Sequence, residues 1–188
     1  MHQRGVLETI PRPQHLQKDK IGKLLLILSQ KRDGRYKARL VYNGRRQKYK
    51  LTSYFGSPTL SRDALWTTLS VAAQNGFNFR SLDMTSAFLY ADLPDDVTLF
   101  AAIPDGHPDS KLQSTHVLRI KKNIHGLKEA PLLWWKHLKQ ILIDVLKVKQ
   151  SIHEECGFSN PSLILLVYVD DILAFASIYT GNIAAPLE

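Results

Sequence analysis

One stretch of the chain, residues 163–176, constrains its fold more than any other. It reads Leu-Ile-Leu-Leu-Val-Tyr-Val-Asp-Asp-Ile-Leu-Ala-Phe-Ala, an apolar run rich in strand formers that two adjacent carboxylates, Asp170 and Asp171, interrupt. Neighbouring Asp side chains in apolar surroundings repel each other and lose hydration, so they need a cation or a solvated turn. A β-hairpin with Asp-Asp at its tip lets the strands pack while the carboxylates face a hard ion such as Mg²⁺. An ordinary acidic surface turn would read the same way.

Length and composition bound the class of protein. With 188 residues, 44% of them hydrophobic, the chain is long enough for one substantial core. No run approaches the roughly 20 apolar residues of a membrane span, and the N-terminus lacks the apolar stretch of a secretion signal. A single cysteine, Cys156, excludes an internal disulfide. We therefore expect an intracellular protein without a membrane partner.

The positive charge is concentrated at the start of the chain. Residues 1–50 carry 14 Lys and Arg residues against 3 acidic residues, whereas the whole chain has a net charge of +8. A one-sided basic segment favours contact with phosphates, above all those of nucleic acid. Residues 1–20 contain Pro11 and Pro13 and show no hydrophobic period, so we expect a disordered basic segment there, and a C-terminal tail over residues 178–188.

Periodicity predicts a basic hairpin and two helices. Residues 23–29 and 35–42 read as two strands, and in the second strand three bases alternate with apolar residues. The bases would line one face about 7 Å apart, a spacing that suits phosphates, although a solvated strand face would look similar. Helices are predicted over residues 62–75, with Ser61 as the N-cap, and over residues 131–147.

A third carboxylate lies far from the first two in sequence. Residues 77–83 alternate like a half-buried strand, and Asp83 falls where this strand should end, a position where Asp is also a common turn residue or helix cap. Three carboxylates together with a basic strand form a set suited to phosphoryl transfer. Two divalent ions about 4 Å apart could then activate a 3′-hydroxyl and stabilise the leaving pyrophosphate.

Four ordered blocks resemble one known family. Tyr-Val-Asp-Asp at residues 168–171 resembles the catalytic box of reverse transcriptases. Three earlier blocks resemble the copia class of LTR retrotransposons, namely Tyr-Lys-Ala-Arg-Leu-Val (36–41), Leu-Asp-Met-Thr-Ser-Ala-Phe-Leu (82–89) and Ile-His-Gly-Leu-Lys-Glu-Ala-Pro (124–131), the last followed by Trp135. The resemblance covers roughly residues 22–177.

The resemblance implies a fold and an activity. The fold would be α+β, with a polymerase palm made of an antiparallel sheet backed by two helices, and a β-rich fingers subdomain, over residues 21–177. The activity would be RNA-directed DNA polymerisation, a nucleotidyl transfer that uses two Mg²⁺ ions, or Mn²⁺ in their place, on an RNA or DNA template-primer and deoxynucleoside triphosphates. The family continues into a primer-gripping hairpin and a helical thumb, and the chain ends 17 residues after Asp171, so we expect the thumb to be absent.

The resemblance also implies residue roles. The three carboxylates would ligate the metal ions, with Asp83 and Asp170 contacting both. Phe88 would be the steric gate that excludes a ribose 2′-hydroxyl, and the Ala87 backbone would approach the incoming nucleotide. The residues expected to face the triphosphate or line the nucleotide pocket are Lys37, Arg39 and Gly126, and those expected to contact nucleic acid are Arg35, Arg45, Arg46 and Tyr168.

Three positions depart from the family pattern at the pocket loop. His125 stands where the family usually has Tyr, Glu129 where it has Gln, and Leu132 where it has Arg. Glu129 would add negative charge near a triphosphate site. Two alternatives therefore stay open: a catalytically inactive, truncated remnant that only binds nucleic acid, and a fragment that needs missing parts of the polyprotein or a partner to fold. The expected location is a cytoplasmic retrotransposon particle or the nucleus.

Overall fold

A computed structural model describes residues 5–47 and 56–176. The described residues form two α-helices and three β-sheets, a mixed architecture that agrees with the predicted class at this level. The chain divides into two compact units. The first unit comprises Met1–Gly56 and Phe88–Trp134, and the second comprises Ser57–Ala87 and Trp135–Glu188. No helix in these two described ranges is long and apolar enough to cross a bilayer.

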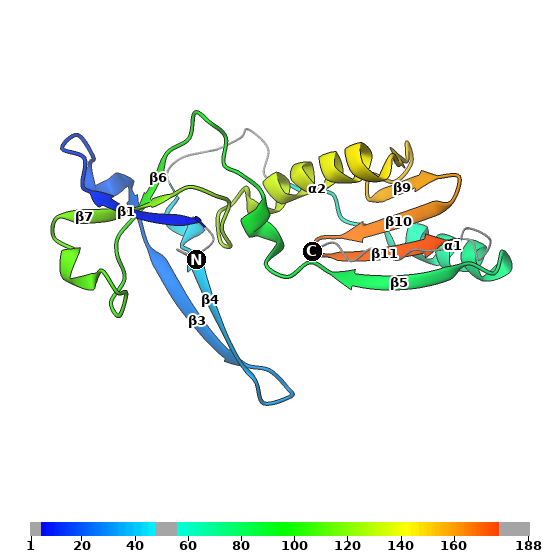
Figure 1. Ribbon diagram of the computed structural model, residues 1–188, viewed down its shortest axis with the longest axis horizontal. Helices are drawn as coiled ribbons and strands as arrows, with labels where there is room; N and C mark the ends of the chain where they lie inside the picture. Colours follow the sequence, from blue (N-terminus) through cyan, green and yellow to red (C-terminus); the bar gives the residue numbers. More distant parts are fainter. Residues whose placement is uncertain (1–4, 48–55, 177–188) are drawn as a thin grey trace. The chain divides into compact units, whose positions relative to one another are not determined.

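The first unit is built on a four-stranded sheet. Its strand order is β1-β7-β6-β2, with bounds β1 Leu7–Pro11, β7 His116–Ile120, β6 Leu99–Ala101 and β2 Ile21–Gly22 (Figure 1). Short 3-10 turns lie at Lys18–Lys20, Gly44–Arg46 and Ser110–Leu112, and the turn Ala87–Tyr90 begins with the last residue of the second unit's first segment. The core beneath the sheet is apolar and almost free of solvent, because Leu99, Leu118 and Ile120 are each at most 2% exposed.

Strand β1 departs from the disorder expected for residues 1–20. It pairs antiparallel with β7 from Leu7 opposite Ile120 to Pro11 opposite His116. Val6 and Leu7 are buried, and this burial of apolar surface outweighs the lack of a hydrophobic period. The prediction therefore does not hold for residues 7–11. The expected tail over residues 178–188 lies outside the described residues.

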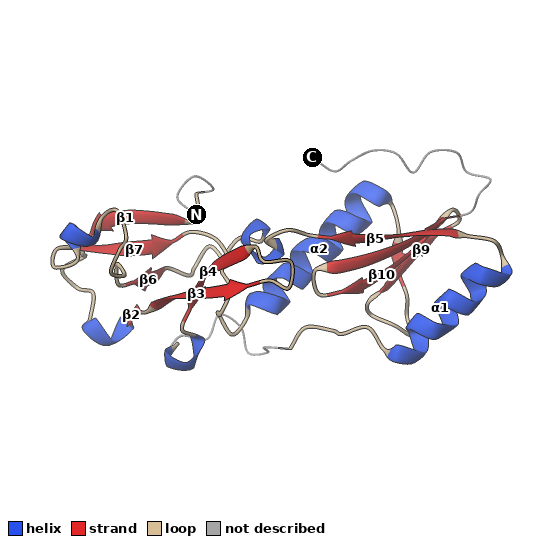
Figure 2. Ribbon diagram, turned by 90° about the horizontal axis from the view of Figure 1, so that it is seen from below, coloured by secondary structure: helices blue, strands red, loops and turns tan. Residues whose placement is uncertain are grey.

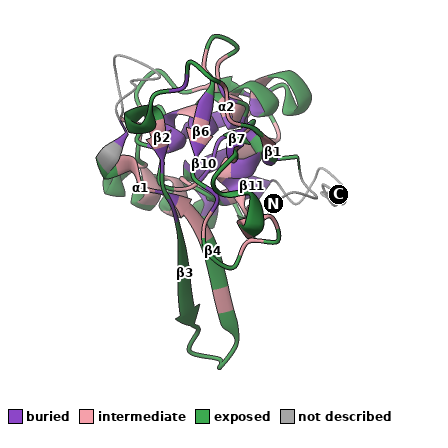
Figure 3. Cartoon of the chain, turned by 90° about the vertical axis from the view of Figure 1, so that its left-hand side faces the viewer, coloured by how far each residue is buried: buried purple, intermediate pink, exposed green. Residues whose placement is uncertain are grey.

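The predicted basic hairpin is present. Strands β3 (Leu24–Gln30) and β4 (Tyr36–Tyr42) pair antiparallel as a separate two-stranded sheet. Gly34 lies in the turn between the two strands and has a φ of 83°. Beside it, the Arg35 guanidinium donates a hydrogen bond to the Asp33 carboxylate, and this bond lowers the pKa of Asp33 below its ordinary value. Figure 3 shows that most of this hairpin is exposed.

Two glycines join the base of this hairpin to the loop at residues 124–129. The Tyr42 amide donates a 2.7 Å hydrogen bond to the carbonyl of His125. A Cβ atom at Gly126 would overlap the carbonyl oxygen of Tyr42, and one at Gly44 would overlap the carbonyl oxygen of Gly126. Gly126 also has a φ of 91°, in the region that favours glycine. Both glycines are thus required for this close backbone approach.

The second unit is a five-stranded antiparallel sheet with one helix on each face. The strand order is β5-β11-β10-β9-β8, with bounds β5 Asn78–Asp83, β11 Asp171–Ala176, β10 Leu163–Tyr168, β9 Gly157–Asn160 and β8 Lys149–Gln150. Helix α1 (Arg62–Gln74) covers one face, and the part of α2 (Ala130–Leu146) from Trp135 onward covers the other (Figure 2). Both predicted helices are confirmed.

Side chains from both faces of the sheet pack against these helices. On the α1 side, Ala72 packs with Leu166 and Phe175. On the α2 side, the rings of Trp135 and Phe158 lie 5.8 Å apart. Helix α1 begins as predicted, because the Ser61 hydroxyl accepts a 3.2 Å hydrogen bond from the Ala64 amide.

The glycine junction gives a stability prediction. Gly126→Ala should lower the free energy of unfolding by about 2–4 kcal/mol, because it adds both left-handed strain and overlap with the Tyr42 carbonyl. Gly106→Ala is the matched control, since Gly106 has a φ of 77° but a Cβ added there would have no atom within 4 Å. The control should lose only about 1 kcal/mol in urea denaturation. Equal losses in the two variants would contradict the close approach.

Candidate active site

The three predicted carboxylates are brought together in the second unit. Strand β11 pairs with β5 so that Asp171 lies directly opposite Asp83. The Met84 amide, one residue after Asp83, donates a 2.9 Å hydrogen bond to the carbonyl of Asp170. Residues opposite each other across two strands present their side chains on one face of the sheet, with Cβ atoms about 4.5–5.5 Å apart. Residues far apart in sequence thus meet through backbone pairing.

The turn before Asp171 is tighter than the sequence suggested. We expected both Asp residues at the hairpin tip, whereas Tyr168 pairs with Asp171 and only Val169 and Asp170 form the turn. Val169 has a φ of 58°, a left-handed conformation that is unfavourable for a β-branched residue. Such strain costs about 1–3 kcal/mol and persists where the surrounding structure fixes it, often at functional sites.

A pocket of about 520 Å³ lies beside one of these carboxylates, Asp171, on the α1 side of the sheet. Its lining includes Asp171 and Leu173 of β11, Tyr168 of β10, and Arg62 and Leu65 of α1. Tyr168, which was expected to contact nucleic acid, is 52% exposed. The candidate carboxylate therefore borders open, partly apolar surface that a ligand can reach.

The donor set suits a hard cation. Asp83, Asp170 and Asp171 are all exposed, and carboxylate oxygens are the ligands that Mg²⁺ prefers. Like charges directly opposite across two strands destabilise a sheet, and a bound cation would relieve the repulsion. Among the described residues, no group of three or more His, Cys, Asp or Glu side chains has the arrangement of a metal site.

Two residues predicted for the nucleotide pocket, Phe88 and Gly126, each contact a different neighbour in the first unit. The Phe88 ring meets the His125 ring edge to face, with centroids 4.7 Å apart and an interplanar angle of 81°. Gly126, the next residue, is the glycine packed against Tyr42. Ala87 belongs to the second unit and is buried, and its amide donates a hydrogen bond to the Met84 carbonyl.

The predicted cationic residues lie in the first unit. Lys37 and Arg39 lie on β4 opposite Ser29 and Ile27, so their side chains share one face of the hairpin. Arg35 forms an exposed 2.6 Å ion pair with Asp33. Arg45 is exposed within the 3-10 turn at Gly44–Arg46, and the side chain of Arg46 is outside the described part of the structure.

The three departures from the family pattern have structural roles. Glu129 is fully buried, and its Oε2 accepts a 2.6 Å hydrogen bond from the side-chain Nε2 of Gln47. The Oε1 of Gln47 accepts a 3.1 Å bond from the Lys128 amide. Leu132 is buried, and His125 packs on Phe88. The Glu129 side chain is therefore buried and hydrogen-bonded to Gln47, and it is not exposed to solvent.

Sequence reasoning missed Gln47. It is separated from Glu129 by 82 positions, and no periodic pattern connects the two residues. The only feature of the nearby sequence that could have pointed to Gln47 is its position directly after Arg45 and Arg46, at the end of the basic turn. Gln47 is 6% exposed and joins the hairpin base to the pocket loop, so it acts as a positioning residue.

The one cysteine takes no part in this chemistry. Burial raises the pKa of the Cys156 thiol to about 12, with smaller contributions from Glu154 and Glu155. A thiol with this pKa is protonated at neutral pH and is a poor nucleophile. Cys156 is therefore a packing residue of the second unit.

Comparison with known proteins identifies the family. Residues 18–183 match the family described as reverse transcriptase (RNA-dependent DNA polymerase). The chain belongs to this reverse transcriptase family. It is also 31% identical over 159 residues to the Transposon Ty1-NL2 Gag-Pol polyprotein of Saccharomyces cerevisiae, and equally to the Ty1-BL polyprotein of the same yeast. These matches cover 84% of the chain but only 9% of each polyprotein. The predicted copia-type reverse transcriptase is confirmed as a family assignment.

The strained turn of the reverse transcriptase segment can be tested by stability. Val169→Asn should raise the free energy of unfolding by about 0.5–1 kcal/mol, because Asn tolerates the left-handed conformation better than Val. Val145→Asn is the control, since Val145 lies exposed in α2 and Val and Asn have similar helix propensities. Denaturant titration of both variants measures the difference. A fall in stability for Val169→Asn would contradict the left-handed turn.

Proposed function

We propose that this chain carries the nucleotidyl-transfer site of an RNA-directed DNA polymerase. The single observation that supports this most is the pairing of Asp171 with Asp83 next to a turn that holds Asp170. Three carboxylate-bearing residues from two distant segments then lie at one end of the β5–β11 strand pair, where repulsion between their charges would favour a divalent cation. The second unit would be the palm, and the β3–β4 hairpin would belong to the fingers.

Asp83, Asp170 and Asp171 would hold Mg²⁺, with Asp83 and Asp170 as the principal ligands. When bound there, Mg²⁺ supplies positive charge that lowers the pKa of a primer 3′-hydroxyl and stabilises the leaving pyrophosphate. In the proposed reaction, the 3′-hydroxyl gives its proton to a solvent water molecule, and its oxygen bonds to the α-phosphorus of a deoxynucleoside triphosphate. The bond from the α-phosphorus to the bridging oxygen breaks, and pyrophosphate leaves.

Residues of the first unit would bind the incoming nucleotide. Lys37 and Arg39 on one face of β4 would contact the triphosphate, whose charge they complement. Phe88, fixed edge-on against His125, would occlude the space that a ribose 2′-hydroxyl needs. Gly126 would line the pocket, and Arg35, Arg45 and Arg46 would contact the nucleic acid. From the second unit, the Ala87 backbone would approach the incoming nucleotide and Tyr168 would contact the nucleic acid.

The proposed partners follow from the family and its relatives. They are an RNA or DNA template-primer, deoxynucleoside triphosphates and further segments of a polyprotein, because the yeast relatives are Gag-Pol polyproteins. We propose that the protein works inside the cell, in a cytoplasmic retrotransposon particle or in the nucleus.

Primer extension tests the proposed activity. On poly(rA)/oligo(dT) with Mg²⁺, the purified chain should incorporate dTMP, and Asp170→Asn/Asp171→Asn should lose at least about 10³-fold, because it removes the metal-binding charge. Asp95→Asn/Asp96→Asn is the matched control, an exposed Asp pair with the same change in charge, and should keep full activity. Absence of incorporation by folded wild-type protein would overturn the proposal and leave nucleic-acid binding as the function.

Sugar selection tests the role of Phe88. Phe88→Ala should lower the ratio of kcat/KM for dTTP to that for UTP at least about ten-fold, because it opens space beside the sugar. Tyr36→Ala, an aromatic truncation at a side chain 87% exposed on the hairpin, should leave this ratio unchanged. The ratio is independent of the fraction of active protein, so a folding defect cannot imitate the effect. An unchanged ratio in Phe88→Ala would show that Phe88 is not the steric gate against the ribose 2′-hydroxyl.

A further inference from the structure

One face of the β3–β4 hairpin is apolar and open to solvent. The register pairs Leu26 with Leu40 and Leu28 with Ala38, and residues paired across two strands share a face of the sheet. Leu26 and Leu28 are 62% and 71% exposed. This apolar face consists of Leu24, Leu26, Leu28, Gln30, Tyr36, Ala38, Leu40 and Tyr42, none of which is charged.

The apolar face begins in the core of the first unit and continues into solvent. At the base of the hairpin, Leu24 and Tyr42 are buried, and Leu40 packs against the same core cluster. Toward the tip, the Tyr36 side chain is exposed. Residues 24–28 read Leu-Leu-Leu-Ile-Leu, a continuous apolar run typical of a strand that is covered on both faces. The sequence of β3 therefore favours a partner that covers this face.

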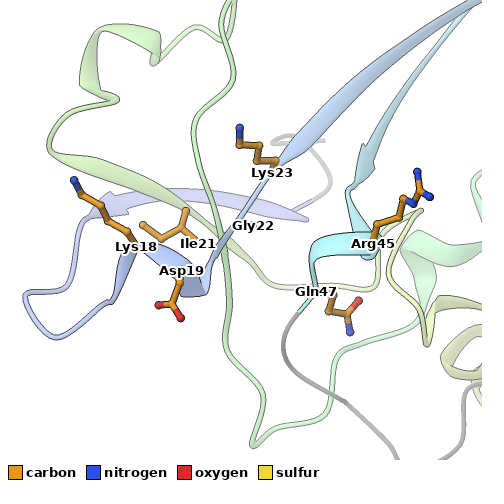
Figure 4. Close-up of a pocket in the computed structure, with 7 residues that line it drawn as sticks. All are labelled: Lys18, Asp19, Ile21, Gly22, Lys23, Arg45 and Gln47. Carbon is orange, nitrogen blue, oxygen red and sulfur yellow. The ribbon is translucent and has the colours of Figure 1, made fainter.

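Cations surround the apolar face. Residues 23–42 carry six Lys and Arg residues against one acid, Asp33. Figure 4 shows Lys23 at the start of β3, and Lys31 and Arg32 are exposed at the tip. Two copies of the hairpin packed face to face would bring like charges together, whereas an acidic partner would be attracted. Charge complementarity thus favours an acidic partner over a second copy of this chain.

Nucleic acid is a poor match for the apolar face. Its phosphates bind cations and its bases stack on aromatic rings. The exposed centre of the face is aliphatic, with Leu26, Leu28 and Ala38, and provides neither. Lys37 and Arg39 lie on the opposite face of the hairpin. The chemistry of the apolar face therefore suits a protein.

We propose that the apolar face binds an acidic amphipathic α-helix of a partner protein. Strand β3 has seven residues, so the face is about 23 Å long. A helix of about 16 residues would span this length, and its diameter of about 10 Å matches a strip two strands wide. The apolar stripe of the helix would cover Leu26 and Leu28, and its acidic residues would lie near Lys23, Lys31 and Arg32. A strip of this size is smaller than a standard protein–protein interface, so the contact would be transient.

Binding of a designed peptide tests this proposal. The probe is a fluorescein-labelled helix of about 16 residues built from Glu-Leu-Leu-Glu repeats, and its affinity for the full chain is measured by anisotropy. Leu26→Thr/Leu28→Thr should weaken binding at least about ten-fold, because two leucines lose their apolar contacts while Thr keeps a high strand propensity. The matched control, Val145→Thr/Ile152→Thr, changes two exposed aliphatic residues of the second unit and should keep the wild-type affinity.

A second peptide tests the role of charge. A helix of the same length built from Lys-Leu-Leu-Lys repeats should bind the wild-type chain at least about ten-fold more weakly, because its charges repel those of the hairpin. This comparison needs no variant, so a folding defect cannot imitate it. Equal affinity for the two peptides would indicate apolar adhesion alone and would overturn the proposal. Unchanged binding of the acidic peptide to Leu26→Thr/Leu28→Thr would also overturn it.

Two further measurements on the same variant distinguish the other occupants. Sedimentation should show that the wild-type chain is a monomer, and dimerisation that Leu26→Thr/Leu28→Thr abolishes would instead assign the face to a second copy. The affinity for a labelled oligothymidylate should be the same in wild type and variant, and a decrease in the variant would instead assign the face to nucleic acid. None of these readouts needs catalysis, so the proposal can hold or fail independently of the polymerase function.

Discussion

The antiparallel pairing of β5 with β11 is the constraint on which the candidate active site depends. It places Asp83 opposite Asp171, and the turn into β11 places Asp170 beside them. Because side chains alternate along a strand, a shift of one residue would move Asp83 to the other face of the sheet. Six residue pairs between the two strands set this register, and on the α1 side the Phe79 ring of β5 lies 6.1 Å from the buried Phe175 ring of β11. Backbone pairing with β11 therefore positions Asp83 opposite Asp171.

Elements whose conformation depends on nearby residues could be predicted from the sequence. Elements whose conformation depends on pairing with residues far away in the sequence could not. Both hairpins, helix α1 with its Ser61 cap, helix α2 and the strand that ends at Asp83 follow from local periodicity. Strand β1 was missed because its partner β7 lies more than 100 positions away. The turn at Val169 and Asp170 was also missed, since Val is a poor turn residue and its left-handed conformation is fixed by the flanking strands.

The same distinction applies to the pocket loop. The sequence suggested that Glu129 would bring negative charge toward a triphosphate, because only its chemical type was visible. In the folded chain it is buried and accepts a hydrogen bond from Gln47, a polar group that would be costly to bury alone. Gly44 and Gly126 allow the hairpin base to approach this loop closely enough for that bond to form. Glu129, where the family usually has Gln, is thus part of the contact between the base of the β3–β4 hairpin and the loop at residues 124–129.

Two unfavourable features coincide at the hairpin that carries Asp170 and Asp171. Val169 is in a left-handed conformation, and Asp171 directly faces another carboxylate, Asp83. Each feature costs stability, and neither contributes to the core. A turn that served only to reverse the chain would avoid both, with Asn or Gly at the strained position and no paired acids. Their coincidence at the exposed end of this hairpin supports the cation site proposed above, and the core of the sheet offsets their cost.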